Sequence, residues 1–479
     1  MDLNPDYIKK NLDQIGKRTA RDILKEWIVN SDNISLRETA LNLYSSMDEG
    51  KEFKFFEQLF LSDESFKIRD LSGNILRDNY FYHKKFVSLL EFTLNNVNNM
   101  DQKSFAVETL NLIDTKKARK IIKDYLRKAI KLSFKKKAYE FPGEIFNSNY
   151  DTPLPSSILE VCFNLILYDY YVNSCGYNVT LRKGLIILLN CEGGKLNDIS
   201  EIQALNKLVK LEHLQLQRNN IQNIHGLSHL TQLKTLNLSQ NQIRKIENLD
   251  GLNNLQEISL SSNKIKKIEN LDFCNLKKLS LDRNLITEIE NLDNLRDLSL
   301  LNLSYNAILK LKNLENLGNL RTLFLSFNQI ETISGLEKLG NLVTLRINDN
   351  RITHIQGLKR LLSLKVLSLS NNIIENIDNL DNLTELNKLE ISSNKIETFD
   401  GLENLKNLQE LFIDKNHIKQ MEGINNLESL IILFLENNDI KDFKLSDIDN
   451  LKNLNFIFLN ENPLTPESWE IYQKRTRFP

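Results

Sequence analysis

Asparagine recurs at intervals of 22 residues through the C-terminal half of this 479-residue chain. Each copy closes the phrase Leu-x-x-Leu-x-Leu-x-x-Asn-x-Ile or a close variant of it. A fixed period of this length indicates a repeat architecture, in which each repeat stacks on its neighbours. The repeated asparagines are Asn219, Asn241, Asn263, Asn284, Asn306, Asn328, Asn350, Asn372, Asn394, Asn416, Asn438 and Asn462.

The segment x-Leu-x-Leu-x alternates apolar and variable residues, which predicts a strand with one buried face. Because these strands recur in one direction, they are expected to pair in parallel while the rest of each repeat returns along the far side. The return stretch has apolar residues at every third position, as in Ile221, Ile224, Leu227 and Leu230, which favours short 3₁₀ helices. The repeats therefore predict a right-handed solenoid.

Two polar positions of the repeat have predicted structural roles. The carboxamide of the repeated asparagine can both donate and accept, so it is expected to satisfy buried backbone groups of neighbouring coils. In the ten copies from Asn219 to Asn416, only Gly or Asn occurs seven positions after the asparagine, which predicts a left-handed backbone conformation there. Those positions are Gly226, Asn248, Asn270, Asn291, Asn313, Gly335, Gly357, Asn379, Gly401 and Gly423.

These motifs resemble the 22-residue subclass of leucine-rich repeat proteins, as in bacterial internalins and the regulatory subunit of type-1 protein phosphatase. The resemblance covers the chain from about residue 190 onward and implies a parallel sheet on a concave face. The tail Asn462-Pro463-Leu464 is similar to that family's C-terminal cap. It implies a final helix that is capped by Thr465 and that lays Trp469 and Tyr472 over the last coil.

The N-terminal third has apolar spacings of three and four, as in Ala20, Ile23, Leu24 and Trp27, which predict amphipathic helices. They form expected pairs over 18–30 with 34–48, 50–62 with 65–79, and 83–97 with 101–114. The pairing resembles HEAT-type alpha repeats, and an irregular helical bundle is the alternative. The predicted domains are a helical domain over 1–140, a junction or N-terminal cap over 141–190, the solenoid over 191–463 and a C-terminal cap over 464–479.

Residues 116–137 form a basic segment with eleven Lys or Arg and one acid, Asp124. Its candidate contact residues are Lys116, Lys120, Lys123 and Arg127. A basic amphipathic helix can be a solvated outer face, or it can bind an acidic protein, an anionic membrane or nucleic acid. The whole chain has a net charge of -1, which by itself indicates neither nucleic acid nor membrane as a partner.

No catalytic, metal or cofactor site is predicted. The six histidines are scattered, and Glu192-Gly193-Gly194-Lys195 lacks the spacing of a phosphate-binding loop. The four cysteines lack metal-type pairing, and the first residues do not read as a signal peptide. We therefore expect reduced thiols and a cytoplasmic location.

The variable strand positions are free to carry function because they project from the sheet. Most are small and polar, and the exceptions form two groups. The mixed cluster comprises Tyr305, Phe324, Phe327, Arg346, Asp349 and Arg351. The acidic cluster comprises Phe412, Phe434 and Glu436, with Phe456 and Phe458 beside it unless they pack under the cap. Exposed aromatics beside arginine on a rigid sheet are typical interface anchors.

The sequence thus predicts an α+β multidomain chain, with an N-terminal all-α helical-repeat domain and a solenoid that has parallel β structure on its concave face and 3₁₀ structure on its convex face. The predicted function is that of a non-enzymatic scaffold or adaptor that binds a protein partner on the concave face. The alternative is a regulatory subunit that controls a phosphatase or GTPase. The sequence predicts neither the partner's identity nor the oligomeric state.

Overall fold

The computed structural model describes residues 4–133, 150–271 and 275–476. The chain divides into two compact units. The helical unit comprises Met1–Ile186 and Ser200–Leu208, and the solenoid unit comprises Ile187–Ile199 and Val209–Pro479. Each unit is built on its own periodicity.

The helical unit consists of short amphipathic helices that pack in sequence order. Contacts join α3 to α4, α5 to α6 and α7 to α8, which confirms the predicted helix pairs. The helices are α1 (Pro5–Lys10), α2 (Leu12–Ile15), α3 (Lys17–Asn30), α4 (Ile34–Ser46), α5 (Phe53–Ser62), α6 (Phe66–Tyr80), α7 (Phe86–Asn96), α8 (Met100–Ile113), α9 (Lys116–Ser133) and α11 (Ser156–Asp169), followed by the π-helix η1 (Tyr170–Ser174) and strand β1 (Asn178–Arg182).

The helix ends and the core of this unit follow from local sequence. Asn33 and Asn99 cap α4 and α8, since each side-chain oxygen accepts a hydrogen bond from the backbone N–H three residues later, at 3.1 Å. Inside, the rings of Phe60 and Phe105 lie 5.2 Å apart, and Gly73 leaves room for Phe60 because a Cβ there would lie 3.1 Å from that ring. Aromatic packing therefore joins α5, α6 and α8.

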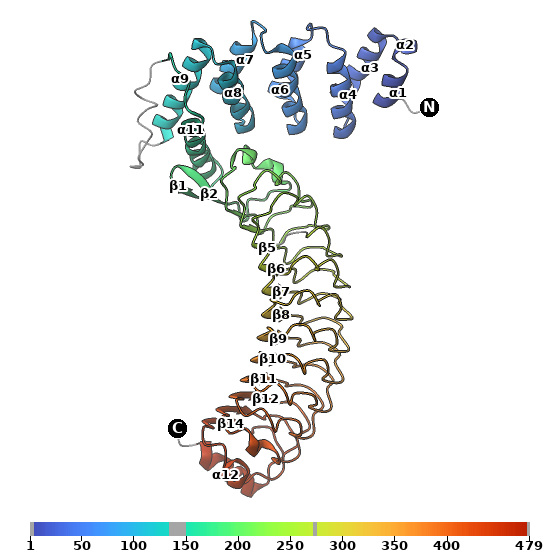
Figure 1. Cartoon of the computed structure of the whole chain (residues 1–479), viewed down its shortest axis with the longest axis vertical. Helices are drawn as coiled ribbons and strands as arrows, with labels where there is room; N and C mark the ends of the chain where they lie inside the picture. The colour runs from blue at the N-terminus through green and yellow to red at the C-terminus, as the bar shows by residue number, and fades with distance from the viewer. Residues whose placement is uncertain (1–3, 134–149, 272–274, 477–479) are drawn as a thin grey trace. The chain divides into compact units, whose positions relative to one another are not determined.

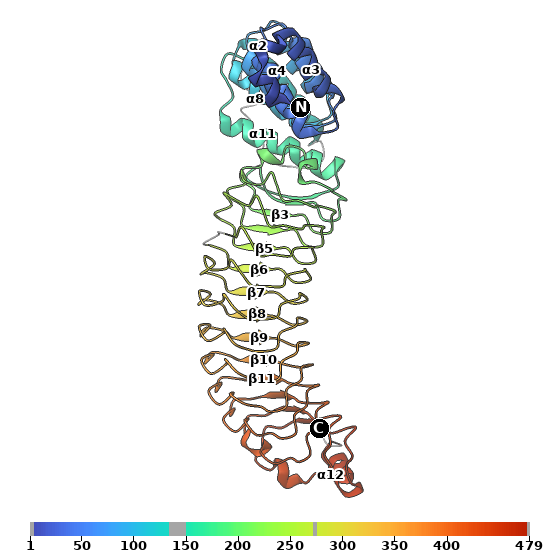
Figure 2. The same cartoon turned by 90° about the vertical axis from the view of Figure 1, so that its right-hand side faces the viewer.

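The solenoid unit is a stack of about twelve turns with one strand in each turn, preceded by one further strand of the same sheet. The strands pair in parallel with a 22-residue register, as in Leu367 beside Leu389, and Figure 1 shows them on the inner side of the curved array. Figure 2 shows the coils as successive rungs. The strands are β2 (Leu185–Asn190), β3 (His213–Gln215), β4 (Thr235–Asn237), β5 (Glu257–Ser259), β6 (Lys278–Ser280), β7 (Leu300–Asn302), β8 (Thr322–Phe324), β9 (Thr344–Arg346), β10 (Val366–Ser368), β11 (Lys388–Glu390), β12 (Glu410–Phe412), β13 (Ile432–Phe434) and β14 (Phe456–Phe458).

On the outer side of each coil, the returning chain forms turns with hydrogen bonds between residues three apart. Examples are the Leu230 N–H to the Leu227 carbonyl and the Leu233 N–H to the Leu230 carbonyl, both at 2.9 Å. This is the predicted 3₁₀ geometry in single turns. It lengthens into 3₁₀ helices at η2 (Ile199–Glu201), η3 (Leu205–Lys207), η4 (Ile424–Asn426) and η5 (Leu445–Ile448). Helix η5 lies in the longest repeat, between Asn438 and Asn462.

The repeated asparagines form the predicted ladder. In a representative coil the Asn394 Nδ2 donates to the Leu369 carbonyl at 3.1 Å and to the Ile391 carbonyl at 3.0 Å. Its Oδ1 accepts from the Ile374 N–H at 3.0 Å. One carboxamide therefore satisfies backbone groups of two coils in the buried interior.

All ten of the predicted Gly or Asn positions have a left-handed backbone, with φ between 55° and 93°. The two residue types act differently there. Asn248 donates from Nδ2 to the Ile224 carbonyl of the preceding coil at 2.7 Å, whereas a Cβ at Gly401 would lie 1.7 Å from the Ile377 carbonyl oxygen. Asparagine bridges the two coils, and glycine lets them approach more closely.

Helix α12 (Pro466–Thr476) closes the solenoid as the cap motif implies. The Thr465 Oγ1 accepts from the Ser468 N–H at 3.3 Å, so Thr465 is the N-cap. Tyr472 is buried, and its hydroxyl accepts from the Leu459 N–H at 3.3 Å. Trp469 covers less of the coil than expected, because 38% of its surface stays exposed.

Candidate functional site

The exposed face of the sheet is organised in columns that run across the strands. The central column contains the residue between the two leucines of each Leu-x-Leu strand. Register places Asn302 beside Phe324, Phe324 beside Arg346, and Arg346 beside Ser368. Farther along, Phe412 lies beside Phe434, which lies beside Phe458. The repeat spacing thus brings residues 22 apart in sequence into contact.

A second column stands directly before the repeated asparagines, and its backbone is left-handed in every coil from Arg218 to Glu461. Tyr305 and Phe327 occupy it with φ of 55° and 58°. The N–H of Tyr305 donates to the Ser326 carbonyl at 2.8 Å, and that of Phe327 donates to the Asn348 carbonyl at 2.9 Å. These bonds to the next coil hold the turn in place whatever the side chain is.

In the mixed cluster, Tyr305 and Phe327 stack with ring centroids 4.1 Å apart and planes 10° apart. Arg283 belongs to the preceding coil, and its guanidinium lies 4.1 Å from the centre of the Tyr305 ring. Tyr305 is 38% exposed and Phe327 is 43% exposed. The result is a short cation–aromatic–aromatic stack with outward-facing surface. Sequence reasoning missed Arg283, although its 22-residue spacing from Tyr305 was a usable signal.

The other members of the mixed cluster lie on β8, on β9 or in the turn after β9. The Arg346 guanidinium lies 5.6 Å from the centre of the half-buried Phe324 ring. Asp349 follows Phe327 in the left-handed column. Burial raises the pKa of its carboxyl, and the hydrogen bond from Asn371, which lowers that pKa, only partly offsets this. Arg351 is exposed but lies beyond Asn350, outside strand β9. The sheet therefore brings five of the six predicted residues to its two columns and leaves Arg351 at their edge.

In the acidic cluster, three phenylalanines form a ladder. The ring centroids of Phe412 and Phe434 are 4.8 Å apart, and those of Phe434 and Phe458 are 4.2 Å apart, each pair with planes 13° apart. The Lys388 ammonium lies 4.7 Å from the Phe412 ring centre. Phe456 is 56% exposed. Phe458 therefore joins the ladder and is half-buried, whereas Phe456 faces solvent, so the alternative of packing under the cap is wrong for Phe456.

Carboxylates border this ladder and pair with the Lys388 ammonium. Lys388 lies 3.0 Å from both Glu390 and Glu410. Burial alone lowers the pKa of Lys388, but its hydrogen bonds to Glu410 and Glu390 outweigh burial and leave that pKa raised. Glu436 accepts from the Asn460 Nδ2 at 2.8 Å and remains half-buried beside Phe434. Lys388 was also missed by sequence reasoning, because it contacts Phe412 diagonally rather than within one column.

The basic helix α9 is less accessible than its charge implies. Lys123 is 1% exposed, and its Nζ donates to the Thr152 carbonyl at 2.8 Å, so the prediction of an accessible contact there is wrong. Lys116 pairs with Asp151 at 2.9 Å, and the Arg127 guanidinium donates to the Tyr150 hydroxyl at 3.0 Å. The chain's own residues 150–152 thus cover part of the basic face.

Lys120 is the member of the four candidate contacts that is exposed and has no ion pair with another described residue. The final residues of the basic segment, 134–137, lie outside the described residues. The exposed part of the predicted contact surface is therefore centred on Lys120 and Lys116.

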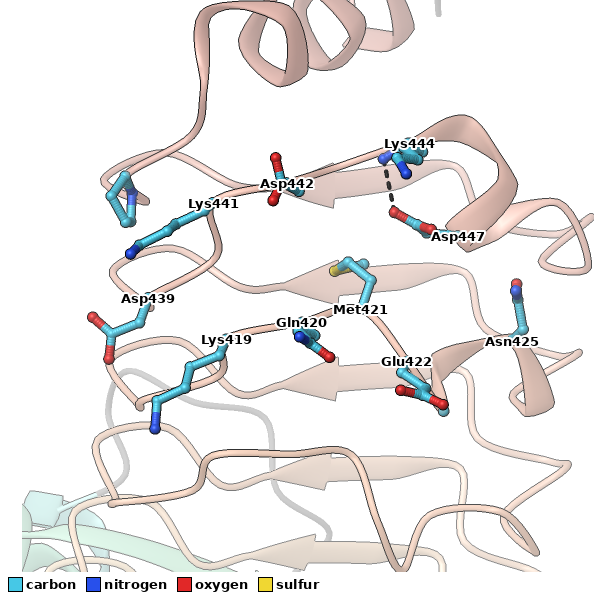
Figure 3. Close-up of a pocket in the computed structure, with 12 residues that line it drawn as sticks. Lys419, Gln420, Met421, Glu422, Asn425, Asp439, Lys441, Asp442, Lys444 and Asp447 are labelled. Carbon is cyan, nitrogen blue, oxygen red and sulfur yellow. Dashed lines mark hydrogen bonds between the residues drawn. The ribbon is translucent and has the colours of Figure 1, made fainter.

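A groove of about 820 Å³ runs along the side of the solenoid between two coils, as Figure 3 shows. Lys419 and Glu422 line one side, and Asp439, Lys441 and Asp442 line the other. Lys419 already pairs with Glu397 at 2.6 Å. Because both signs of charge alternate along its walls, the groove favours no single class of ligand.

Within residues 4–133, 150–271 and 275–476, no three His, Cys, Asp or Glu side chains are grouped so that they could hold a metal ion. The His225 Nε2 lies 2.8 Å from the Asp198 Oδ2. Within the same ranges, none of the helices is both long enough and apolar enough to cross a membrane.

Comparison with known proteins identifies the repeat. A family model described as "Leucine Rich repeats (2 copies)" matches residues 231–273, 318–360 and 362–404. A search of curated proteins found no match. The family match falls within the solenoid unit.

Solved structures give the same result. An internalin, inlF, from Listeria monocytogenes is similar with a TM-score of 0.55 and 27% identity, covering 72% of this chain and 89% of that one. The leucine-rich repeat protein LIC12759 from Leptospira interrogans has a TM-score of 0.50 and 29% identity, covering 59% of this chain and 80% of that one. The FLRT2 chain of an octameric complex with Latrophilin 3 and Unc5D has a TM-score of 0.50 and 20% identity, covering 63% and 89%, and shows the fold alone.

Proposed function

Because this chain belongs to the leucine-rich repeat proteins, we propose that it is a non-enzymatic scaffold that captures a protein partner on the concave face of its sheet. Solenoids of this kind present extended concave surfaces that are commonly used for protein–protein interaction. The proposed contact surface consists of the mixed cluster and the acidic cluster.

The observation that carries the proposal is the exposed Tyr305–Phe327 stack beside Phe324 and Arg346. These side chains contribute nothing to the leucine core. Phe324 and Arg346 stand on paired strands, and Tyr305 and Phe327 stand on the left-handed turns that follow β7 and β8. Aromatic and arginine side chains dominate the binding energy of many interfaces, and truncating one such anchor commonly costs about 2 kcal/mol or more. A pre-formed rigid surface also lowers the entropy cost of binding.

The charges of the two clusters suggest how a partner is oriented. Arg346 and Arg351 give the mixed cluster positive charge beside Asp349, and Arg283 adds to it from a neighbouring coil. Glu436 gives the acidic cluster negative charge. A partner with the opposite polarity would bind in one direction along the sheet. Complementary charge of this kind contributes mainly to specificity and to the rate of association.

The test is affinity purification with the full chain, with and without alanine at both Phe324 and Arg346. The proposal expects a partner protein that the wild-type chain retains and the double variant loses. The control is Leu362→Ala, which truncates a side chain that is 58% exposed in a return segment. Undiminished capture by the double variant, with the fold intact by circular dichroism, would count against the proposal.

We also propose the cytoplasm as the compartment. Cys162 and Cys175 are free thiols, which fits a reducing environment. Fractionation of the source cells, with detection of the chain, tests this. Recovery from the extracellular fraction would contradict it.

A further inference from the structure

The helical unit contains a cavity of about 520 Å³. Residues from α7, α8, α9, α11 and the π-helix η1 line it, and all of them belong to that one compact unit. Its volume lies within the range of roughly 300–1,000 Å³ that is usual for small-molecule sites. The cavity is separate from the sheet of the solenoid, so it is independent of the proposed partner surface.

Two hydrogen-bond donors border this cavity without a partner among the described residues: the Lys103 ammonium and the Tyr125 hydroxyl. Both side chains are half-buried. Burial lowers the pKa of Lys103 and raises the pKa of Tyr125 to about 12, because in each case the charged form loses hydration. Partly buried polar groups without partners cost free energy, which a bound acceptor would recover.

The rest of the lining separates into an apolar floor and a charged rim. Leu94, Met100 and Ile166 are buried and present hydrocarbon to the cavity. Lys128 is exposed at the rim and adds a second ammonium. Asp169 also lines the cavity, but its Oδ1 already accepts from the Asn173 Nδ2 at 2.6 Å. The available groups therefore favour a ligand with an anionic end and an apolar body.

A local backbone irregularity points to the same place. The chain leaves α11 through the π-helix η1, in which the Cys175 N–H donates to the Tyr170 carbonyl at 3.2 Å. Tyr170 and Ser174, the two ends of η1, both line the cavity. π-Helical turns are rare and occur frequently at functional sites. This observation is independent of the unpartnered donors.

We propose that this cavity binds a small amphipathic carboxylate, whose anionic end accepts hydrogen bonds from Lys103 and Tyr125 and whose apolar body lies on Leu94, Met100 and Ile166. The carboxylate supplies the acceptor that both donors lack. The Lys128 ammonium adds long-range attraction at the entrance. The ligand is recognised by one charged end and by the shape of its apolar part.

The test is calorimetric titration of the full chain with decanoate, and with decanol as the uncharged analogue. Decanoate should bind, and decanol should bind at least about ten-fold more weakly, since it cannot form the charge-assisted hydrogen bond. Lys103→Met should weaken decanoate binding by about ten-fold or more, and Tyr125→Phe by several-fold. Lys54→Met is the matched control, because Lys54 is an exposed lysine on α5 of the same unit.

Thermal melting of each variant verifies that the helical unit still folds. If Lys103→Met does not fold, Tyr125→Phe still tests the site, because it removes only one oxygen atom. The proposal is overturned if decanoate gives no binding at about 1 mM, or if decanol binds as tightly as decanoate. It is also overturned if folded Lys103→Met or Tyr125→Phe binds decanoate as the wild type does. Loss of protein-partner capture on the solenoid would not affect any of these outcomes.

Discussion

Phe327 stacks on Tyr305 with ring centroids 4.1 Å apart, and both residues have a left-handed backbone. The fold therefore places two bulky L-residues in a conformation that ordinarily costs each about 1–2 kcal/mol. Hydrogen bonds from their N–H groups to the next coil maintain it. The aromatic surface is thus displayed at an energetic cost that the repeat itself imposes.

This left-handed backbone predicts that, at position 327, glycine is more stable than alanine, which reverses the usual order. Phe327→Gly should be more stable than Phe327→Ala by about 1 kcal/mol, because glycine adopts positive φ without the Cβ penalty. Urea unfolding of the two variants measures the difference. At Thr322, in strand β8, the order should be normal, with alanine more stable than glycine. A normal order at Phe327 as well would contradict the left-handed backbone.

The asparagine ladder predicts a local effect on hydrogen exchange. Asn394→Ala leaves the buried Ile374 N–H without its side-chain acceptor, at about 1–3 kcal/mol, whereas the Leu369 and Ile391 carbonyls still accept from Asn372 and Asn416. Exchange of the Ile374 amide should therefore be much faster than in the wild type. The control is Asn382→Ala, since the Asn382 Nδ2 makes only an exposed 3.3 Å bond to the Lys359 carbonyl. Equal protection of Ile374 in both variants would refute the role of the ladder.

Two glycines of the repeat predict unequal costs of substitution. Gly226→Ala should cost about 1 kcal/mol, the cost of positive φ alone, because no atom lies within 4 Å of the added Cβ. Gly401→Ala should cost at least about 2 kcal/mol more, because its Cβ would lie 1.7 Å from the Ile377 carbonyl oxygen and the coils must separate. Chemical denaturation compares them. Similar losses would show that close approach of the coils is not needed at Gly401.

Neighbouring lysines of α9 should respond differently to charge reversal. Lys123→Glu buries a negative charge where the Lys123 ammonium contacts the Thr152 carbonyl, so it should cost at least about 2 kcal/mol. Lys120→Glu changes an exposed residue and should stay within about 0.5 kcal/mol. Thermal melting of the two variants tests this. A Lys123→Glu variant as stable as Lys120→Glu would contradict the burial of Lys123.

The repeat made most of the solenoid predictable, because its strands, its buried asparagines and its left-handed glycines each require particular residue types. Leucine alternation predicted the strands, and the roles of Asn394 and Gly401 followed from carboxamide chemistry and from the freedom of glycine. The left-handed column before the repeated asparagines was not predicted. It holds residues as different as Arg218, Tyr305 and Asp349, since backbone hydrogen bonds rather than side chains fix that turn.

Side-chain contacts were predictable only in part. The 22-residue spacing indicates that Tyr305 and Phe327 are neighbours, but the parallel stacking of their rings depends on rotamers that the spacing does not determine. Burial of Lys123 could not be predicted, because its partner Thr152 is 29 residues away in a non-repeating segment. The cavity beside Lys103 was missed for the same reason, since helices distant in sequence form it.

The most direct test of the proposed function is site-specific photocrosslinking from the sheet. A photoreactive side chain at Thr344, in strand β9 beside Arg346, should crosslink the partner protein, and alanine at both Phe324 and Arg346 should remove that crosslink. The same group at Leu362, in a return segment, should give none. A crosslink from Leu362 with none from Thr344 would contradict capture on the concave face.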